Sequence, residues 1–111
     1  MTAYVPAKGD IVAVSLDPQV GHEQKGRRPA LVISNDLFNR HTGMAVLCPI
    51  TNTRRDFPFH VALPADTSVT GSVMIEQVKS IDCRARRVRF IERVPERTLR
   101  DVLGILDAVL Y

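Results

Sequence analysis

The sequence is poor in cysteine and in aromatic residues, with two cysteines, four phenylalanines, two tyrosines and no tryptophan among 111 residues. Two cysteines are too few for a disulfide framework, and neither Cys48 nor Cys83 belongs to a C-x-x-C pair of the kind that binds zinc. No other residues cluster with metal-ligand spacing. We therefore expect no metal site, a buried structural role for Cys48, and a reducing compartment, the cytoplasm.

Long apolar runs are also missing. Residues 1–8 lack the apolar region of a signal peptide, and no run approaches the length of a membrane span, so we expect a soluble protein that does not use a membrane. The sequence contains no nucleotide-binding glycine loop, no H-E-x-x-H, no G-x-S-x-G and no carboxylates paired at glycosidase spacing. Most enzyme classes are thereby excluded, and no cofactor is expected.

Positive charge is present in moderate excess, with a formal net charge of +3 and an isoelectric point near 9.2. Most of the basic residues are arginines, and a group of them gathers near the C-terminus at Arg84, Arg86, Arg87, Arg89 and Arg93. Because the planar, permanently charged guanidinium suits phosphate, this cluster favours a nucleic acid partner. A solvated strand face is the alternative interpretation.

Short β-like runs occupy most of the chain. They are apolar or alternating, rich in β-branched residues and bounded by Gly, Pro, Asn or Asp; the runs are 10–16, 30–34, 44–50, 57–63, 72–75, 78–81 and 88–91. Pro58 places its run at a sheet edge or a strand start. Residues 35–42 form one or two helical turns, capped by Asn35 or Ser34 and ended by Gly43.

The closing segment has a different period. After Pro95, apolar residues recur at spacings of three and four, which predicts an amphipathic helix. Its apolar stripe consists of Leu99, Val102, Leu103, Leu106, Val109 and Leu110. A helix of this length is marginal alone, so the stripe must pack on the sheet or on a partner chain. The pattern predicts one domain over 1–111 of the mainly β (α+β) class, a small, strongly bent sheet or barrel with a C-terminal helix.

A polar loop with two glycines, residues 21–28, delivers two consecutive arginines to an apolar run. Arg28 precedes Pro29, which biases the arginine backbone towards an extended conformation and so restricts where its guanidinium points. A restrained guanidinium fork is suited to binding a phosphodiester. The alternative interpretation is a solvated hairpin loop.

Four blocks in order resemble the MazF/PemK (Kid-like) toxins of bacterial type II toxin–antitoxin pairs. The blocks are KGDIV at 8–12, DP at 17–18 with GHEQ at 21–24 and RP at 28–29, CPIT at 48–51, and EQVKSID at 76–82 leading to RAR at 84–86. The resemblance spans nearly the whole chain. It implies an SH3-like β-barrel of the PemK/CcdB type, a homodimer, a cognate antitoxin, and sequence-specific, metal-independent, ribosome-independent cleavage of single-stranded RNA, the activity of an mRNA interferase.

The resemblance also assigns site residues. Arg28 and Thr51 match the two positions most closely tied to cleavage, and His22 and Glu23 match loop positions that contact RNA and assist catalysis. The remaining residues assigned to RNA binding are Gln24, Lys25, Arg54, Glu76, Gln77, Lys79, Arg84 and Arg86. In Kid-like members an Asp stands at the position of Glu76 and an Arg at that of Met74, so their proposed acid–base pair is not present intact.

The chemistry of RNA agrees with this assignment, because RNA carries its own nucleophile, the 2′-hydroxyl. Attack by that group needs positioning, charge stabilisation and proton transfer, and it yields a 2′,3′-cyclic phosphate and a 5′-hydroxyl. Arg28 scarcely deprotonates, so it is assigned to the phosphorane oxygen, with Thr51 as a hydrogen-bond donor. His22, Glu23 and Glu76 are alternative proton-transfer groups.

Two other functions fit parts of the sequence. The gyrase inhibitor CcdB has the same barrel architecture, and a shared fold does not fix activity. A non-catalytic nucleic-acid-binding module would use the same arginines for phosphate contacts alone.

An acidic, disordered antitoxin tail would also be attracted to the expected basic groove of Arg54, Arg55, Lys79, Arg84 and Arg86.

Overall fold

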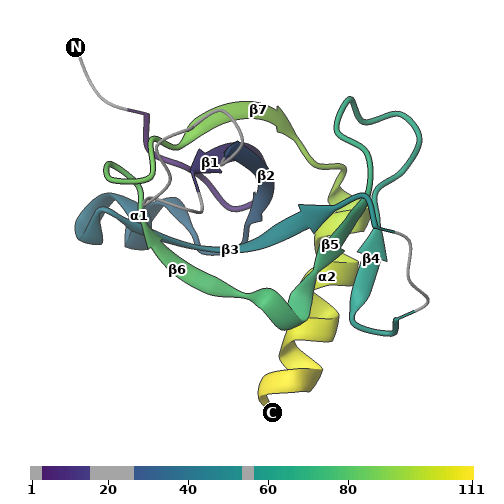
Figure 1. Ribbon diagram of the computed structural model, residues 1–111. Helices are drawn as coiled ribbons and strands as arrows, with labels where there is room; N and C mark the ends of the chain where they lie inside the picture. The colour runs from purple at the N-terminus through teal and green to yellow at the C-terminus, as the bar shows by residue number, and fades with distance from the viewer. Residues whose placement is uncertain (1–3, 16–26, 54–56) are drawn as a thin grey trace.

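The computed structural model describes residues 4–15, 27–53 and 57–111 (Figure 1). In these residues the chain forms seven strands, two α-helices and a 3-10 turn. They are β1 (Asp10–Ser15), β2 (Arg27–Val32), α1 (Asp36–Thr42), β3 (Met44–Thr51), β4 (His60–Ala62), β5 (Ser72–Met74), η2 (Ile75–Gln77), β6 (Lys79–Asp82), β7 (Arg89–Arg93) and α2 (Glu96–Leu110). No helix among them is long and apolar enough to cross a membrane.

The strands form one antiparallel sheet that is organised around the long strand β3. The sheet order is β4-β5-β3-β2-β1-β7, and β6 pairs with β3. The first half of β3 pairs with β6 and its last two residues pair with β5, while β2 runs along its other edge. The expected bent, mainly β architecture with a C-terminal helix is confirmed.

The described strands do not close into a complete barrel, because β6 and β7 are joined by a turn and are not paired with each other. The turn is built by Asp82, whose Oδ1 accepts hydrogen bonds from the backbone N–H groups of Arg84 and Ala85, both at 3.0 Å. Arg87 follows in the left-handed region with φ 53°. The turn redirects the chain so that β7 pairs with β1 on the far side of the sheet.

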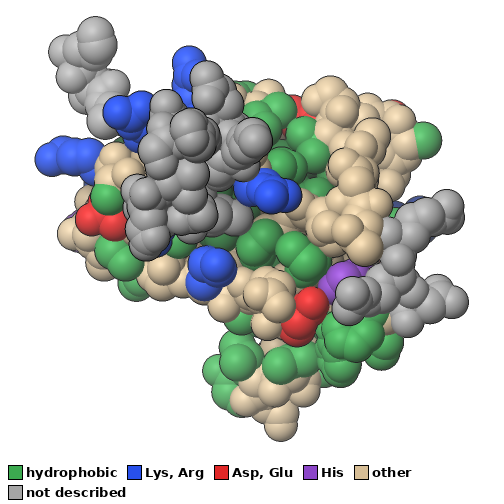
Figure 2. Space-filling model, in the orientation of Figure 1, with side chains coloured by type: hydrophobic (Ala, Val, Ile, Leu, Met, Phe, Trp, Pro, Cys, Tyr) green, Lys and Arg blue, Asp and Glu red, His purple; other side chains and the backbone are tan. Residues whose placement is uncertain are grey.

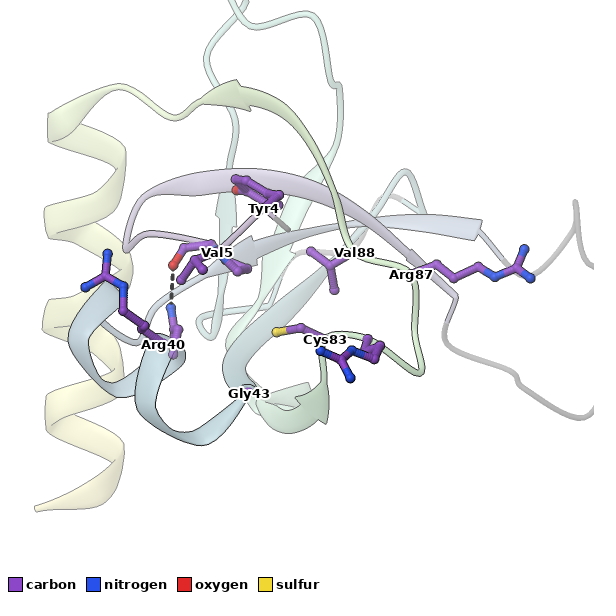
Figure 3. Close-up of a pocket in the computed structure, with 10 residues that line it drawn as sticks. Tyr4, Val5, Arg40, Gly43, Cys83, Arg87 and Val88 are labelled. Atoms are coloured by element: carbon purple, nitrogen blue, oxygen red, sulfur yellow. Dashed lines mark hydrogen bonds between the residues drawn. The ribbon is translucent and has the colours of Figure 1, made fainter. Parts of the chain in front are cut away.

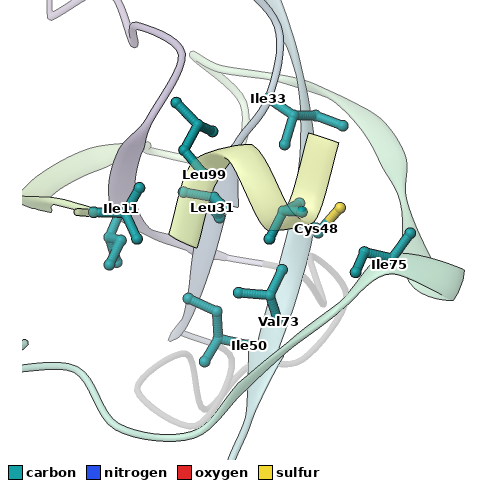
Figure 4. Close-up of a cluster of buried hydrophobic side chains, with 10 residues drawn as sticks. Ile11, Leu31, Ile33, Cys48, Ile50, Val73, Ile75 and Leu99 are labelled. Atoms are coloured by element: carbon teal, nitrogen blue, oxygen red, sulfur yellow. The ribbon is translucent and has the colours of Figure 1, made fainter. Parts of the chain in front are cut away.

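Two apolar clusters pack on the two faces of the sheet, as the alternation of strand side chains requires. Ile11 and Leu31 belong to the cluster covered by α2, whereas their neighbours Val12 and Val32 belong to the cluster among β1, β2, β3 and β6. Figure 4 shows Leu99 of α2 next to the strand residues of the first cluster. Cys48 is fully buried there, which confirms its predicted structural role.

Both helices confirm their sequence signals. In α1 the Asn35 side chain accepts a hydrogen bond from the N–H of Phe38 at 2.9 Å, and Gly43 ends the helix with φ 72°. In α2 Leu99 and Val102 are buried against the sheet, but Val109 and Leu110 at its C-terminal end are more than half exposed. The apolar stripe therefore extends past the part of the sheet that this chain provides.

Candidate active site

Arg28 lies near the start of β2, with its side chain exposed and its backbone in the extended conformation that Pro29 favours. It pairs across the sheet with Val14 of β1. On the other side, the β2–β3 ladder ends with Ala30 opposite Pro49. Arg28 lies two residues before Ala30 on β2, and Thr51 lies two residues after Pro49 on β3, so both stand at the same end of this ladder.

Thr51 ends β3, and its surroundings fix both its backbone and its hydroxyl. The Thr51 Oγ1 accepts a hydrogen bond from the N–H of Thr53 at 3.1 Å, so the hydroxyl keeps its own proton for donation to another group. Gly71 lies against the Thr51 carbonyl with φ 120°, and a Cβ added there would overlap the carbonyl oxygen. The chain can pass this close only because residue 71 is a glycine.

A hollow of about 250 Å³ opens beside Thr51 where β3, β4, β5 and η2 meet. Its lining residues are Thr51, Thr53, His60, Met74, Glu76 and Gln77. The strand pairing explains this gathering, because β5 pairs with both β3 and β4 and sets Thr51 opposite Ser72 and His60 opposite Met74. Three of the predicted residues, Thr51, Glu76 and Gln77, are thus brought together.

The hollow also contains a hydrogen-bonded pair of side chains that the sequence did not reveal. His60 Nε2 lies 3.0 Å from Glu76 Oε2, and the two residues are sixteen positions apart in the chain. The His60 side chain is only 6% exposed, and the Phe57 ring packs edge-on against it at 5.0 Å between centroids. The only sequence signal was a histidine at a polar position in an alternating strand, a pattern that is ordinarily a solvated residue.

The other predicted RNA-binding residues in the described part lie along β6 and the turn that follows it. Lys79 begins β6 and is exposed, and Arg86 donates from Nη1 to the Ser15 carbonyl at 3.2 Å. Arg84 is exposed in the turn and does not share the hollow of Thr51. On the face shown in Figure 2, basic side chains lie over the middle and one side of the molecule, and a histidine and an acidic side chain lie together beyond them.

Arg84 instead lines a second hollow, of about 270 Å³, formed by the N-terminal segment, α1 and the turn after β6. Figure 3 shows the Cys83 sulfur among Tyr4, Val5 and Val88, with the Arg87 side chain extending away. Burial raises the pKa of the Cys83 thiol, and burial raises that of Cys48 to about 12, so neither thiol is ionised at neutral pH. Neither cysteine is therefore an activated nucleophile.

Five predicted site residues lie outside the described residues; they are His22, Glu23, Gln24, Lys25 and Arg54, and Arg55 of the expected basic groove lies outside them as well. Among the described residues, no three His, Cys, Asp or Glu side chains lie close enough together to hold a metal ion.

Comparison with known proteins places this geometry in a family. Residues 7–110 match the PemK-like, MazF-like toxin of type II toxin–antitoxin systems. The Endoribonuclease PemK of Escherichia coli is 42% identical over 107 residues, which cover 93% of this chain and 80% of that protein. The crystal structure of MazF from Deinococcus radiodurans superposes with a TM-score of 0.87 at 42% identity, over 97% of this chain and 98% of that one.

A second structure from Deinococcus radiodurans, titled as a MazE–MazF complex, contains a chain that superposes with a TM-score of 0.86 at 36% identity, over 97% of each chain. The matches therefore cover nearly the whole fold, in which β2 carries Arg28, β3 carries Thr51 and η2 carries Glu76. On these matches, the chain belongs to the PemK-like, MazF-like toxin family of type II toxin–antitoxin systems.

Proposed function

We propose that this chain is an endoribonuclease toxin that cleaves single-stranded RNA at short specific sequences, without a metal ion and without the ribosome. Family membership and the endoribonuclease names of the relatives favour RNA cleavage over the gyrase-poison and non-catalytic alternatives. The observation that carries the proposal is that Arg28 and Thr51 lie on the adjacent strands β2 and β3, with Thr51 lining the hollow that also holds Glu76.

In the proposed reaction, the RNA 2′-hydroxyl attacks the neighbouring phosphorus and releases the 5′-oxygen of the next nucleotide. Arg28 stabilises the charge that develops on the non-bridging phosphorane oxygens, since its guanidinium stays protonated throughout. Thr51 donates a hydrogen bond to the same group from the hydroxyl proton that its contact with Thr53 leaves available. The products are a 2′,3′-cyclic phosphate and a 5′-hydroxyl.

Proton transfer is assigned to three candidate groups, His22, Glu23 and Glu76, of which Glu76 lines the hollow beside Thr51. The remaining residues proposed to contact RNA are Gln24, Lys25, Arg54, Gln77, Lys79, Arg84 and Arg86. Bases of single-stranded RNA are read by stacking and by their exposed edges, so residues 21–28 and the residues of β6 and its turn would select the sequence.

We further propose that the toxin acts in the cytoplasm as a homodimer and is neutralised by an acidic antitoxin. The exposed apolar end of α2 supports a partner surface, and relatives in this family are known in structures titled as antitoxin complexes. A basic face attracts an acidic, disordered peptide as readily as it attracts RNA phosphates.

The first prediction tests the reaction itself. Incubation of the purified chain with a long mixed-sequence RNA in EDTA should give discrete cleavage products, because the mechanism needs no metal. Arg28→Ala and Thr51→Ala should each lower the rate by about 10²–10³, the usual effect of removing one preorganised donor to an oxyanion. Both variants should keep the wild-type circular dichroism spectrum. A requirement for Mg²⁺, or full activity in Arg28→Ala, would contradict the mechanism.

A further inference from the structure

The His60–Glu76 pair lies inside the hollow of Thr51, but no role has been assigned to His60 so far. The two side chains come from different elements, His60 from β4 and Glu76 from η2, and the contact between Nε2 and Oε2 is 3.0 Å. Glu76 is about one third exposed, whereas His60 is almost completely enclosed. The carboxylate therefore reaches the open space of the hollow, with the histidine behind it.

The surroundings of the His60 ring leave little of its surface exposed to RNA. Its Nδ1 is buried and has no hydrogen-bond partner among the described residues, and its Nε2 is engaged with Glu76. The Phe57 ring closes one side of it. A buried polar nitrogen without a partner is a cost to folding, and such costs are typical of functional sites. The contact between His60 Nε2 and the Glu76 carboxylate is therefore the feature of this histidine that a functional role would use.

The strand register explains why a histidine stands here. His60 of β4 lies directly opposite Met74 of β5, two residues before Glu76. Met74 has no charge with which to hold the Glu76 carboxylate. His60 supplies a nitrogen to that carboxylate from the neighbouring strand. A Glu side chain has several rotatable bonds, and the contact with His60 limits the orientations that its carboxylate takes.

We propose that His60 is a positioning residue for RNA cleavage, which orients the Glu76 carboxylate as the proton-transfer group beside Thr51. In the step so assisted, the 2′-oxygen bonds to phosphorus, its proton moves to the Glu76 carboxylate, the P–O5′ bond breaks, and the 5′-oxygen takes a proton from water. The inference rests on the proposed endoribonuclease function, and it selects Glu76 from the three proton-transfer candidates.

The test uses the full chain and a short RNA oligonucleotide that spans its strongest mapped cleavage site. His60→Leu should lower kcat by about 10–10² with little change in KM, because the carboxylate would lose its orientation while the RNA contacts remain. His60→Gln should recover part of that loss, since an amide N–H can also donate to Glu76. His41→Gln is the matched control, because His41 is exposed on α1 and its Nδ1 contacts the Leu37 carbonyl of the same helix; it should cleave like the wild type.

A double-mutant cycle separates positioning from simple structural support. Glu76→Gln alone should lower kcat at least as much as His60→Leu, and the double variant should be no slower than Glu76→Gln. Fully additive losses, or an unchanged kcat in a folded His60→Leu protein, would overturn the inference. If only the inference on His60 fails, the wild type still cleaves RNA and Arg28→Ala still shows its predicted loss of rate. If the proposed function fails, the wild-type protein does not cleave RNA at all.

Discussion

At the scale of single residues, close backbone contacts hold Thr51, a proposed catalytic residue, in place alongside a side-chain hydrogen bond. Thr51 is set at its place by the pairing of β3 with β5, by the N–H of Thr53 and by the contact with Gly71. A site that must align a phosphodiester loses rate steeply when a donor moves by an ångström. We therefore expect Gly71 to matter for the cleavage rate, because it allows the close contact with the Thr51 carbonyl.

This gives a prediction for Gly71→Ala. The backbone φ of 120° disfavours any side chain, at a cost of roughly 1–3 kcal/mol, and the new methyl group would also push on the Thr51 carbonyl. We expect a lower melting temperature and, in the folded protein, a lower cleavage rate. Gly43→Ala is the matched control, since Gly43 also has positive φ but its added Cβ would meet nothing within 4 Å. It should lose stability but keep its rate; equal rate losses in both variants would contradict the role of the Thr51 contact.

At the scale of secondary structure elements, a carboxylate on β7 fastens the loop that leads into β5. Glu92 accepts hydrogen bonds from the N–H of Val69 at 2.9 Å and from the N–H and hydroxyl of Ser68 at 3.1 and 2.8 Å. The hydrogen bond from the N–H of Val69 lowers the pKa of this carboxyl most; burial opposes it, and the two hydrogen bonds from Ser68 lower the pKa further, so that it lies below its usual range. The loop it fastens includes Gly71, so the clamp is connected to the site through Thr51.

The lowered pKa gives a prediction about acid stability. A carboxyl whose pKa is lower in the folded state stabilises the fold above its unfolded pKa, about 4.3 for glutamate, and this contribution is lost as pH falls through the folded pKa. Urea unfolding should therefore show Glu92→Gln to be less stable than the wild type at pH 7, with the difference shrinking as pH falls below about 4. Ser68→Ala should show a smaller effect of the same sign. A stability difference that is constant from pH 7 to pH 3 would contradict this account.

The elements were predictable from the sequence because each carries a local signal. Asn35 and Gly43 bound α1, Pro95 precedes α2, alternation marks β1, and a compact apolar run marks β3. Strand ends were less well defined. β2 begins at Arg27, three residues before its predicted start, because Arg27 and Arg28 pair with β1 although the prediction rested on the apolar residues that follow them. The predicted strand at 72–75 ends at Met74, where η2 begins.

The site was predictable only where a motif carried it. Arg28 and Thr51 stand in short blocks that can be read directly, and the structure places them on adjacent strands. His60 could not be found in this way, since its role depends on a partner sixteen positions away and on the β4–β5 register. The contact between Gly71 and Thr51 was hidden for the same reason, because it joins segments that meet only in the folded chain.

At the scale of the whole molecule, the exposed apolar end of α2 bears on assembly. Val109 is 52% and Leu110 63% exposed, although both continue the stripe that packs Leu99 and Val102 on the sheet. Exposed apolar surface of this kind is typical of an interaction site. We predict that sedimentation at micromolar concentration gives twice the chain mass. A monomer that cleaves RNA at the full rate would contradict the homodimer.

The charge of the whole molecule bears on its control in the cell. An unopposed ribonuclease is harmful, so expression of this chain alone should arrest growth, and growth should be restored either by Arg28→Ala or by co-expression of the cognate antitoxin.

We expect that antitoxin to be acidic, because the chain has a net charge of +3 and exposed basic residues on β6 and the turn after it. Charge steering is screened beyond about 10 Å at 0.1 M salt, so the association rate of toxin and antitoxin should fall steeply as salt is raised, with a smaller change in dissociation. Stopped-flow measurements across a salt series would test this. Lys79→Ala and Arg84→Ala should each slow association. Arg100→Ala is the control, because it removes an exposed charge on α2. An association rate independent of salt, or an antitoxin complex that still cleaves RNA at the full rate, would show that control does not work by covering this basic face.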